Sequence, residues 1–189
     1  MTKSYSAEIL EAQQRTIRFG LTCPEISSTC ERLLTPERHE QFPYAVRDAV
    51  GDLGLEAVVA QCLSLHWRLK EPLEEFFGVP ILYTIGYVHT PPSYMFRQSE
   101  SDLLRLLQTG IQGPQLNIHA WLTLPSAEII DLSLPTSFAV VNKMKDGLGG
   151  VIAAHADELN HGLRYHPMLL GEDYLRRIGA LVEFNTYGI

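Results

Sequence analysis

The sequence predicts an α+β fold, with a helical N-terminal part and a central cysteine-bearing helix packed on an antiparallel β-sheet. Three observations favour this class. Residues 1–50 combine amphipathic spacing with helix-capping residues, residues 55–69 carry an apolar stripe at helical spacing, and residues 116–134 alternate as in a β-hairpin. Helices followed by mostly antiparallel strands form an α+β domain. A length of 189 residues fits one domain.

Three helices are expected in the N-terminal part. An amphipathic helix over 9–19 stops at Gly20, because glycine commonly ends helices. A second, begun by a proline, covers 24–34. A third follows Thr35, a preferred capping residue, and Pro43 interrupts it.

The central helix is predicted from apolar residues at steps of 3, 4, 3 and 4, which form the stripe of a buried helix. These are Leu55, Val58, Cys62, Leu65 and Leu69. Pro72 ends the helix, because proline lacks a backbone N–H. β-Branched and aromatic residues then predict a strand over 81–89. A further helix over 102–108 stops at Gly110.

Residues 116–134 give the clearest β-hairpin. The polar face of its first strand holds Asn117, His119, Trp121 and Thr123. The turn centres near Pro125, so an odd-length loop such as 124–126 places His119 opposite Asp131 on that face, off the core. A two-residue loop would place these two side chains on opposite faces.

The C-terminal part gives weaker patterns. Residues 138–141 favour a further strand, and residues 173–184 favour a last amphipathic helix. The polar cluster of His155, Asp157, His161 and His166 is typical of a solvated loop or helix end.

Charge and cysteine content limit the expected partners. A formal net charge of −7 argues against a nucleic-acid partner, because phosphate binding needs a basic surface. No stretch approaches the roughly 20 apolar residues that cross a bilayer, and no secretory signal precedes the first helix, so no membrane partner is expected. Three cysteines make a poor disulfide framework, which favours a reducing, cytoplasmic location. No cofactor and no metal are expected.

The hairpin and the central helix together supply a thiol, an imidazole and a carboxylate. A carboxylate beside an imidazole fixes its tautomer and raises its basicity. An imidazole that takes the proton of a thiol makes the sulfur nucleophilic. The order Cys62, His119, Asp131 therefore indicates thiol acyl chemistry.

Five short motifs resemble the transglutaminase-like branch of the papain-like cysteine-enzyme fold. They are Gln61-Cys62, Gly78-Val79-Pro80, Gly86-Tyr87, His119-Ala120-Trp121 and Asp131. Each motif alone is weak, but five in order over about residues 55–140 are more specific.

The resemblance implies a catalytic triad, with Cys62 as nucleophile, His119 as general base and then acid, and Asp131 as its orienter. It also implies an oxyanion hole formed by the cysteine N–H and a nearby donor. The candidates for oxyanion or substrate contacts are Gln61, Asn117 and Trp121.

The resemblance further implies one transglutaminase-like domain over residues 1–189. It comprises a helical segment 1–50, a catalytic core 51–140 and a C-terminal segment 141–189. The expected function is a peptidase, amidase, deamidase or acyltransferase, acting on a protein, a peptide, or a small amide or thioester.

Several alternatives stay open on the sequence alone. The family's cysteine starts its helix, whereas a helix beginning at Leu55 would place Cys62 inside it; an extended 54–60 would preserve the family arrangement. A non-catalytic binding module of the same fold is an alternative function, since the apolar stripe would bury the thiol. A metal site formed by Cys62, His66 and His119 is a third.

Overall fold

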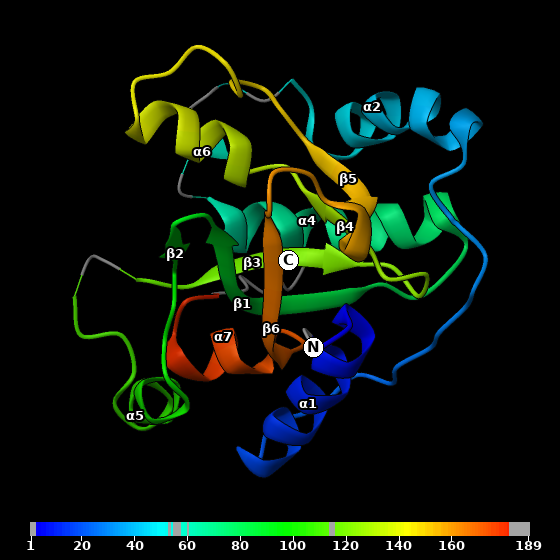
Figure 1. The fold of residues 1–189 in the computed structure, drawn as a ribbon. Coiled ribbons are helices and arrows are strands. Elements are labelled where there is room, and N and C mark those ends of the chain that lie inside the picture. Colours follow the sequence, from blue (N-terminus) through cyan, green and yellow to red (C-terminus); the bar gives the residue numbers. More distant parts are fainter. Residues whose placement is uncertain (1–2, 53, 55–57, 60, 114–115, 182–189) are drawn as a thin grey trace, which may run out of the picture.

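A computed structural model describes residues 3–52, 54, 58–59, 61–113 and 116–181 and consists of helices packed around a curled antiparallel sheet (Figure 1). The α+β class is therefore confirmed. The strands run in the order β2-β1-β3-β4-β5, and β6 pairs with β1. The strands are β1 (Leu82–Thr90), β2 (Ser93–Met95), β3 (His119–Thr123), β4 (Glu128–Asp131), β5 (Ile152–His155) and β6 (Arg164–Leu170). The helices are α1 (Tyr5–Arg18), α2 (Pro36–Val50), α4 (Cys62–Phe77), α5 (Glu100–Thr109), α6 (Leu134–Val141) and α7 (Asp173–Ile178), with a 3-10 turn η1 (Ala156–Glu158).

The first and third of the predicted N-terminal helices are present as α1 and α2. The side chain of Thr35 accepts a hydrogen bond from the N–H of Arg38, which caps α2. Pro43 lies inside α2, so the predicted interruption is wrong. Pro43 is exposed, and so is His39, whose carbonyl would have bonded to the missing N–H. Water can satisfy that carbonyl, which explains why the helix continues.

The helix predicted over 24–34 is absent, because this segment bonds to the hairpin instead. The N–H of Thr29 donates to the carbonyl of Pro125 at 3.0 Å. The buried carboxylate of Glu128 accepts the N–H groups of Leu33 and Leu34 at 2.9 and 3.1 Å. Figure 1 shows the segment running along one side of the molecule between α1 and α2.

The central helix α4 begins at Cys62, after the capping residue Gln61, and ends at Gly78. Of the predicted stripe before Cys62, Leu55 lies outside the described residues, and Val58 is buried in the core as predicted. Pro72 does not end the helix as predicted, since α4 continues to Phe77. The carbonyl that Pro72 leaves without a donor belongs to Arg68, which is exposed.

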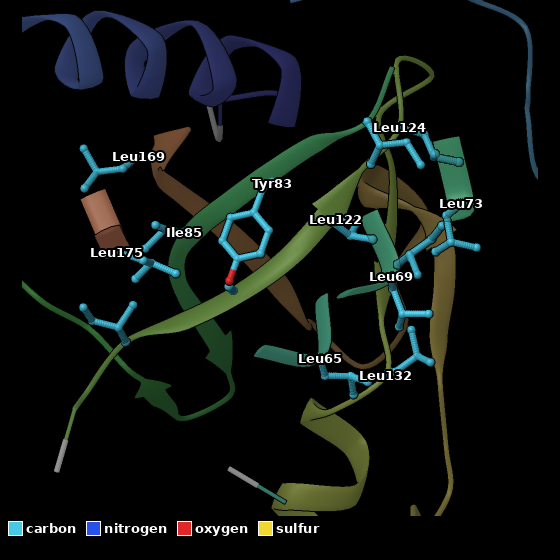
Figure 2. Packing of buried hydrophobic residues seen from close by; sticks show 14 of the residues in the cluster. Leu65, Leu69, Leu73, Tyr83, Ile85, Leu122, Leu124, Leu132, Leu169 and Leu175 are labelled. Atoms are coloured by element: carbon cyan, nitrogen blue, oxygen red, sulfur yellow. The ribbon is translucent and has the colours of Figure 1, made fainter. Parts of the chain in front are cut away.

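The central strands β1, β3 and β4 are buried on both faces of the sheet, which the sequence did not predict. On one face, the leucine side chains of α4 pack against residues from β1 and β3 (Figure 2). The residues labelled there include Leu65, Leu69, Leu73, Tyr83, Ile85, Leu122 and Leu124. On the other face, Tyr5, Ile9 and Ala12 of α1 form a second cluster with Trp121 and Ile129. The predicted polar face of β3 is therefore part of the core.

The hairpin loop is one residue further along than predicted. Leu122 pairs with Ile130 and Thr123 with Ile129, which leaves three loop residues, 125–127, between Leu124 and Glu128. The loop length stays odd, so His119 and Asp131 remain on one face, as diagonal neighbours rather than as a directly opposed pair.

The C-terminal part differs from the prediction at several elements. His155 ends β5 and His166 lies within β6, rather than in a solvated loop or helix end. Residues 138–141 belong to helix α6, not to a strand, because the carboxylate of Asp131 accepts the N–H groups of Ser133 and Leu134 and starts a helix there. Helix α7 begins at Asp173 as predicted and ends at Ile178. The predicted continuation to residue 184 is wrong over 179–181, because Gly179 adopts a left-handed conformation that ends the helix; residues 182–184 lie outside the described residues. Among the described residues, none of the helices has the length and apolarity needed to cross a membrane.

Candidate active site

Cys62 occupies the first position of α4, next to the start of β3. The residue is 7% exposed. The sulfur lies 3.8 Å from the carbonyl oxygen of Ile118, and the thiol also hydrogen-bonds to the imidazole of His119. The first turn of α4 holds no acidic side chain, and Gln61 provides no side-chain cap. Cys62 therefore lies at the positive end of the helix dipole, with no acidic side chain in the first turn to offset it.

His119 is the first residue of β3 and is almost completely buried. Its Nε2 lies 2.6 Å from Oδ2 of Asp131, which leaves Nδ1 for the thiol. The ring stacks on Phe96 at 4.9 Å between ring centres. Burial alone would lower the pKa of His119, but the charges of Asp131 and Cys62 and their hydrogen bonds outweigh burial and raise that pKa to about 10. An imidazolium is thus the favoured state beside the sulfur.

Asp131 ends β4, is completely buried and accepts hydrogen bonds on both oxygens. His119 and the hydroxyl of Tyr165 donate to Oδ2, the latter at 2.8 Å. Oδ1 accepts the N–H and the hydroxyl of Ser133 and the N–H of Leu134, at 2.9 to 3.0 Å. Burial would raise the pKa of Asp131, yet the charge and hydrogen bond of His119, together with the N–H of Leu134, lower that pKa below its ordinary value. The carboxylate is therefore a fixed anion that orients His119.

The candidate site therefore consists of a thiol at a helix start, a buried imidazole, and a carboxylate whose two oxygens both accept hydrogen bonds. Comparisons of the chain with protein-family models, curated proteins and solved structures find no match. What the site can do must therefore be argued from its own atoms.

The three other predicted site residues lie in different surroundings. Gln61 is exposed at the start of α4, and its Oε1 accepts the hydroxyl of Ser64 at 3.1 Å. Asn117 is exposed two residues before His119, and its carbonyl accepts Nε2 of Gln98. Trp121 is completely buried, and its indole N–H donates to Tyr5 at 2.8 Å. That N–H is therefore committed to the core and does not serve an oxyanion.

His66 lies one helical turn after Cys62 and is completely buried. Its Nδ1 is 2.8 Å from the carbonyl oxygen of Cys62, and its Nε2 accepts the N–H of Leu132 at 3.0 Å. Both ring nitrogens are thus engaged with the backbone. Among the described residues, no group of three or more His, Cys, Asp or Glu side chains has the arrangement of a metal site.

Two contributors to the site were missed at the sequence level. Tyr165 comes from β6, which pairs with β1, and its hydroxyl donates to Asp131. The pattern of apolar and polar residues around Tyr165 did not indicate this contact. Phe96 follows β2 and adopts a φ of 62°, a conformation that few bulky residues adopt. The left-handed backbone conformation of Phe96 cannot be predicted from the sequence. Its stacking on His119 follows only once β1 is known to pair with both β2 and β3.

The raised pKa of His119 predicts how its contribution to stability depends on pH. A group with a raised folded pKa stabilises fully below its unfolded value of 6.5 and loses this contribution as the pH rises through about 10. We expect the difference in free energy of unfolding between wild type and His119→Gln to shrink from pH 6.5 to pH 10. Urea unfolding at pH 6.5, 8 and 10 measures it. The exposed His39→Gln serves as control, and a difference that grows with pH would contradict the ion pair.

Proposed function

We propose that this chain is a thiol-dependent acyl-transfer enzyme in which Cys62 is the nucleophile, His119 the acid and base, and Asp131 the orienter. The observation that carries the proposal is the contact between a thiol at a helix start and an imidazole held by a fully hydrogen-bonded carboxylate. This combination activates a thiol for attack on a carbonyl carbon.

In the first half-reaction, Sγ of Cys62 forms a bond to the carbonyl carbon, and the electron pair of the C=O bond moves to oxygen. The N–H groups of the first turn of α4 have no partner within the helix, so the N–H of Cys62 is suited to bind that oxyanion. When the intermediate collapses, the bond to the leaving group breaks, and the leaving group takes the proton of His119. An acyl-enzyme remains.

In the second half-reaction, water or an amine attacks the acyl carbon and gives its proton to His119. Collapse of this second intermediate expels the Cys62 thiolate and restores the imidazolium. Water as acceptor gives a peptidase, amidase or deamidase, and an amine gives an acyltransferase. We place the substrate among proteins, peptides and small amides or thioesters, whose carbonyl groups all fit this chemistry.

We also propose that the fold is transglutaminase-like. The support is a cysteine at the start of a central helix, followed by a strand that begins with the histidine and an antiparallel strand that ends with the aspartate. The helix start at Cys62 favours the arrangement in which the helix dipole assists the thiolate. The single domain with its 51–140 core and the cytoplasmic location stay predictions.

One observation favours the non-catalytic binding module. The residue Cys62 is 7% exposed and His119 is 1% exposed, so a substrate has little direct access in this conformation. Against it, an assembled charged triad is costly to bury without a use, because each ion loses its hydration. The two functions differ in whether the sulfur reacts.

Thiol labelling tests the proposed function. At pH 6 an ordinary thiol is almost entirely protonated, whereas a sulfur paired with an imidazolium stays reactive. We expect iodoacetamide to label Cys62 at least about tenfold faster than Cys30, although Cys30 is exposed and Cys62 is buried. Peptide mass spectrometry follows all three cysteines over time. His119→Gln should remove the advantage, and Cys62→Ala should abolish turnover without unfolding the protein.

Equal labelling of the three cysteines, or labelling that leaves Cys62 untouched, would favour the binding module. Cys23 provides an internal reference, because it is partly buried and burial raises the pKa of its thiol. Its labelling should lag behind that of Cys30.

A further inference from the structure

His66 is a completely buried titratable residue that the reaction described above does not use. Its ring links the backbone of the nucleophile to the backbone that follows the orienter, because one ring nitrogen contacts the carbonyl of Cys62 and the other contacts the N–H of Leu132. Leu132 directly follows Asp131, so the imidazole spans the gap between the two catalytic elements.

The two backbone partners fix the protonation of His66. A carbonyl oxygen only accepts, so Nδ1 carries the proton that goes to Cys62. A backbone N–H only donates, so Nε2 must offer its lone pair to Leu132. The ring is therefore neutral, with its single proton on Nδ1.

This tautomer keeps Asp131 available to His119. Oδ1 of Asp131 lies 3.6 Å from Nε2 of His66, but Nε2 has no proton to donate to it. His119, at 2.6 Å on the other oxygen, is then the sole imidazole that donates to the carboxylate. A protonated His66 would compete for the same charge and weaken the ion pair that activates Cys62.

The charged surroundings agree with a neutral ring. Burial lowers the pKa of His66, and the neighbouring His119 lowers it further, against the opposing effects of Asp131 and the Cys62 carbonyl. These groups come from α4, β3 and β4, the elements that meet at this ring.

We infer that His66 is a positioning residue of the proposed acyl transfer, tying the carbonyl of Cys62 to the N–H of Leu132 and leaving Asp131 to His119 alone. The inference rests on the proposed function, because it assigns His66 to the geometry of that same site. Catalytic groups need alignment to a fraction of an ångström, and a displacement of 1 Å can cost about a hundredfold in rate.

Three substitutions separate the two bonds of His66. The amide N–H of His66→Asn takes the place of Nδ1 and keeps the bond to Cys62. The amide oxygen of His66→Gln takes the place of Nε2 and keeps the bond to Leu132. His66→Phe keeps a ring of similar shape and loses both bonds.

The experiment measures the rate of Cys62 alkylation by iodoacetamide from pH 5 to pH 9, with urea unfolding to confirm that each variant is folded. We expect His66→Phe to react about ten- to a hundredfold more slowly than wild type at pH 6, with a changed pH profile. His66→Asn and His66→Gln should each recover part of the rate. The exposed His39→Phe is the matched control and should react like wild type.

The outcomes distinguish a failure of the role of His66 from a failure of the proposed function. Folded His66 variants that keep both the wild-type rate and the wild-type pH profile would overturn the role of His66 while leaving the triad intact. If His66→Phe does not fold, the Asn and Gln variants decide the question by the same readout. If wild-type Cys62 itself reacts no faster than Cys30, the proposed function fails, and the role of His66 fails with it.

Discussion

Asp131→Asn should slow the acylation of Cys62 by about 10³- to 10⁴-fold while the protein stays folded. The reason is the orientation that the substituted amide must adopt among its hydrogen-bond donors. Two backbone N–H groups and one hydroxyl, from Ser133 and Leu134, donate to the Oδ1 position. The amide oxygen is required there, because an amide NH₂ would meet three donors.

The NH₂ group of the substituted residue then points at Nε2 of His119 and donates to it. This reverses the hydrogen bond of the wild type and forces the imidazole proton onto Nδ1, the nitrogen that faces the thiol. A ring in this tautomer cannot take the thiol proton, and it no longer gains from a neighbouring carboxylate charge. The His119 ring therefore keeps its orientation, but it no longer activates the Cys62 thiol.

The measurement uses 4-nitrophenyl acetate as an acyl donor, with release of nitrophenol and the acetylated Cys62 peptide as readouts. Asp146→Asn, an exposed change of the same kind, is the control and should leave the rate unchanged. An Asp131→Asn protein that acylates within about threefold of wild type would refute the orienting role of Asp131, since this role depends on its charge.

The hairpin illustrates which features of the site the sequence predicts. Alternation and the odd loop length placed His119 and Asp131 on one face, and they remain on one face although the loop lies one residue further along. Side chains alternate between the two faces along a strand, so a register shift of two positions leaves His119 and Asp131 on the same face. The number of donors on Asp131 could not be predicted in this way, because Tyr165 arrives from β6, which is distant in the sequence.

The errors in the fold share a physical cause, which is that partners distant in the sequence decided the outcome. Residues 24–34 have the start signal of a helix, but the buried Glu128 binds their N–H groups instead. The polar alternation of β3 predicted an exposed face, yet Tyr5 of α1 covers it and accepts the indole N–H of Trp121. Capping residues, in contrast, act locally, and Ser99 before α5 shows a complete capping box.

Gly86→Ala should destabilise the protein by about 3 kcal/mol, because the strands of the site meet at this position with no room for a side chain. Gly86 in β1 pairs with His119 on one side and with Pro167 on the other. A Cβ atom there would lie 2.1 Å from the carbonyl oxygen of His166 and 2.7 Å from Cη2 of Trp121. The first contact involves backbone, so relief requires β6 to move away from β1.

Such a movement would also reach the active site. Strand β6 carries Tyr165, which donates to Asp131, and the displaced Trp121 ring lies 5.9 Å from the His119 ring. We therefore expect Gly86→Ala to lower both the free energy of unfolding in urea and the alkylation rate of Cys62 in the folded protein.

Gly113→Ala is the matched control, because a Cβ atom at Gly113 meets nothing within 4 Å. It should change the free energy of unfolding by less than about 0.5 kcal/mol. If Gly86→Ala is no more destabilising than Gly113→Ala, the close approach of β6 to β1 is wrong. The reach of Tyr165 to Asp131 would then lose its support, because that contact depends on the same spacing between the strands.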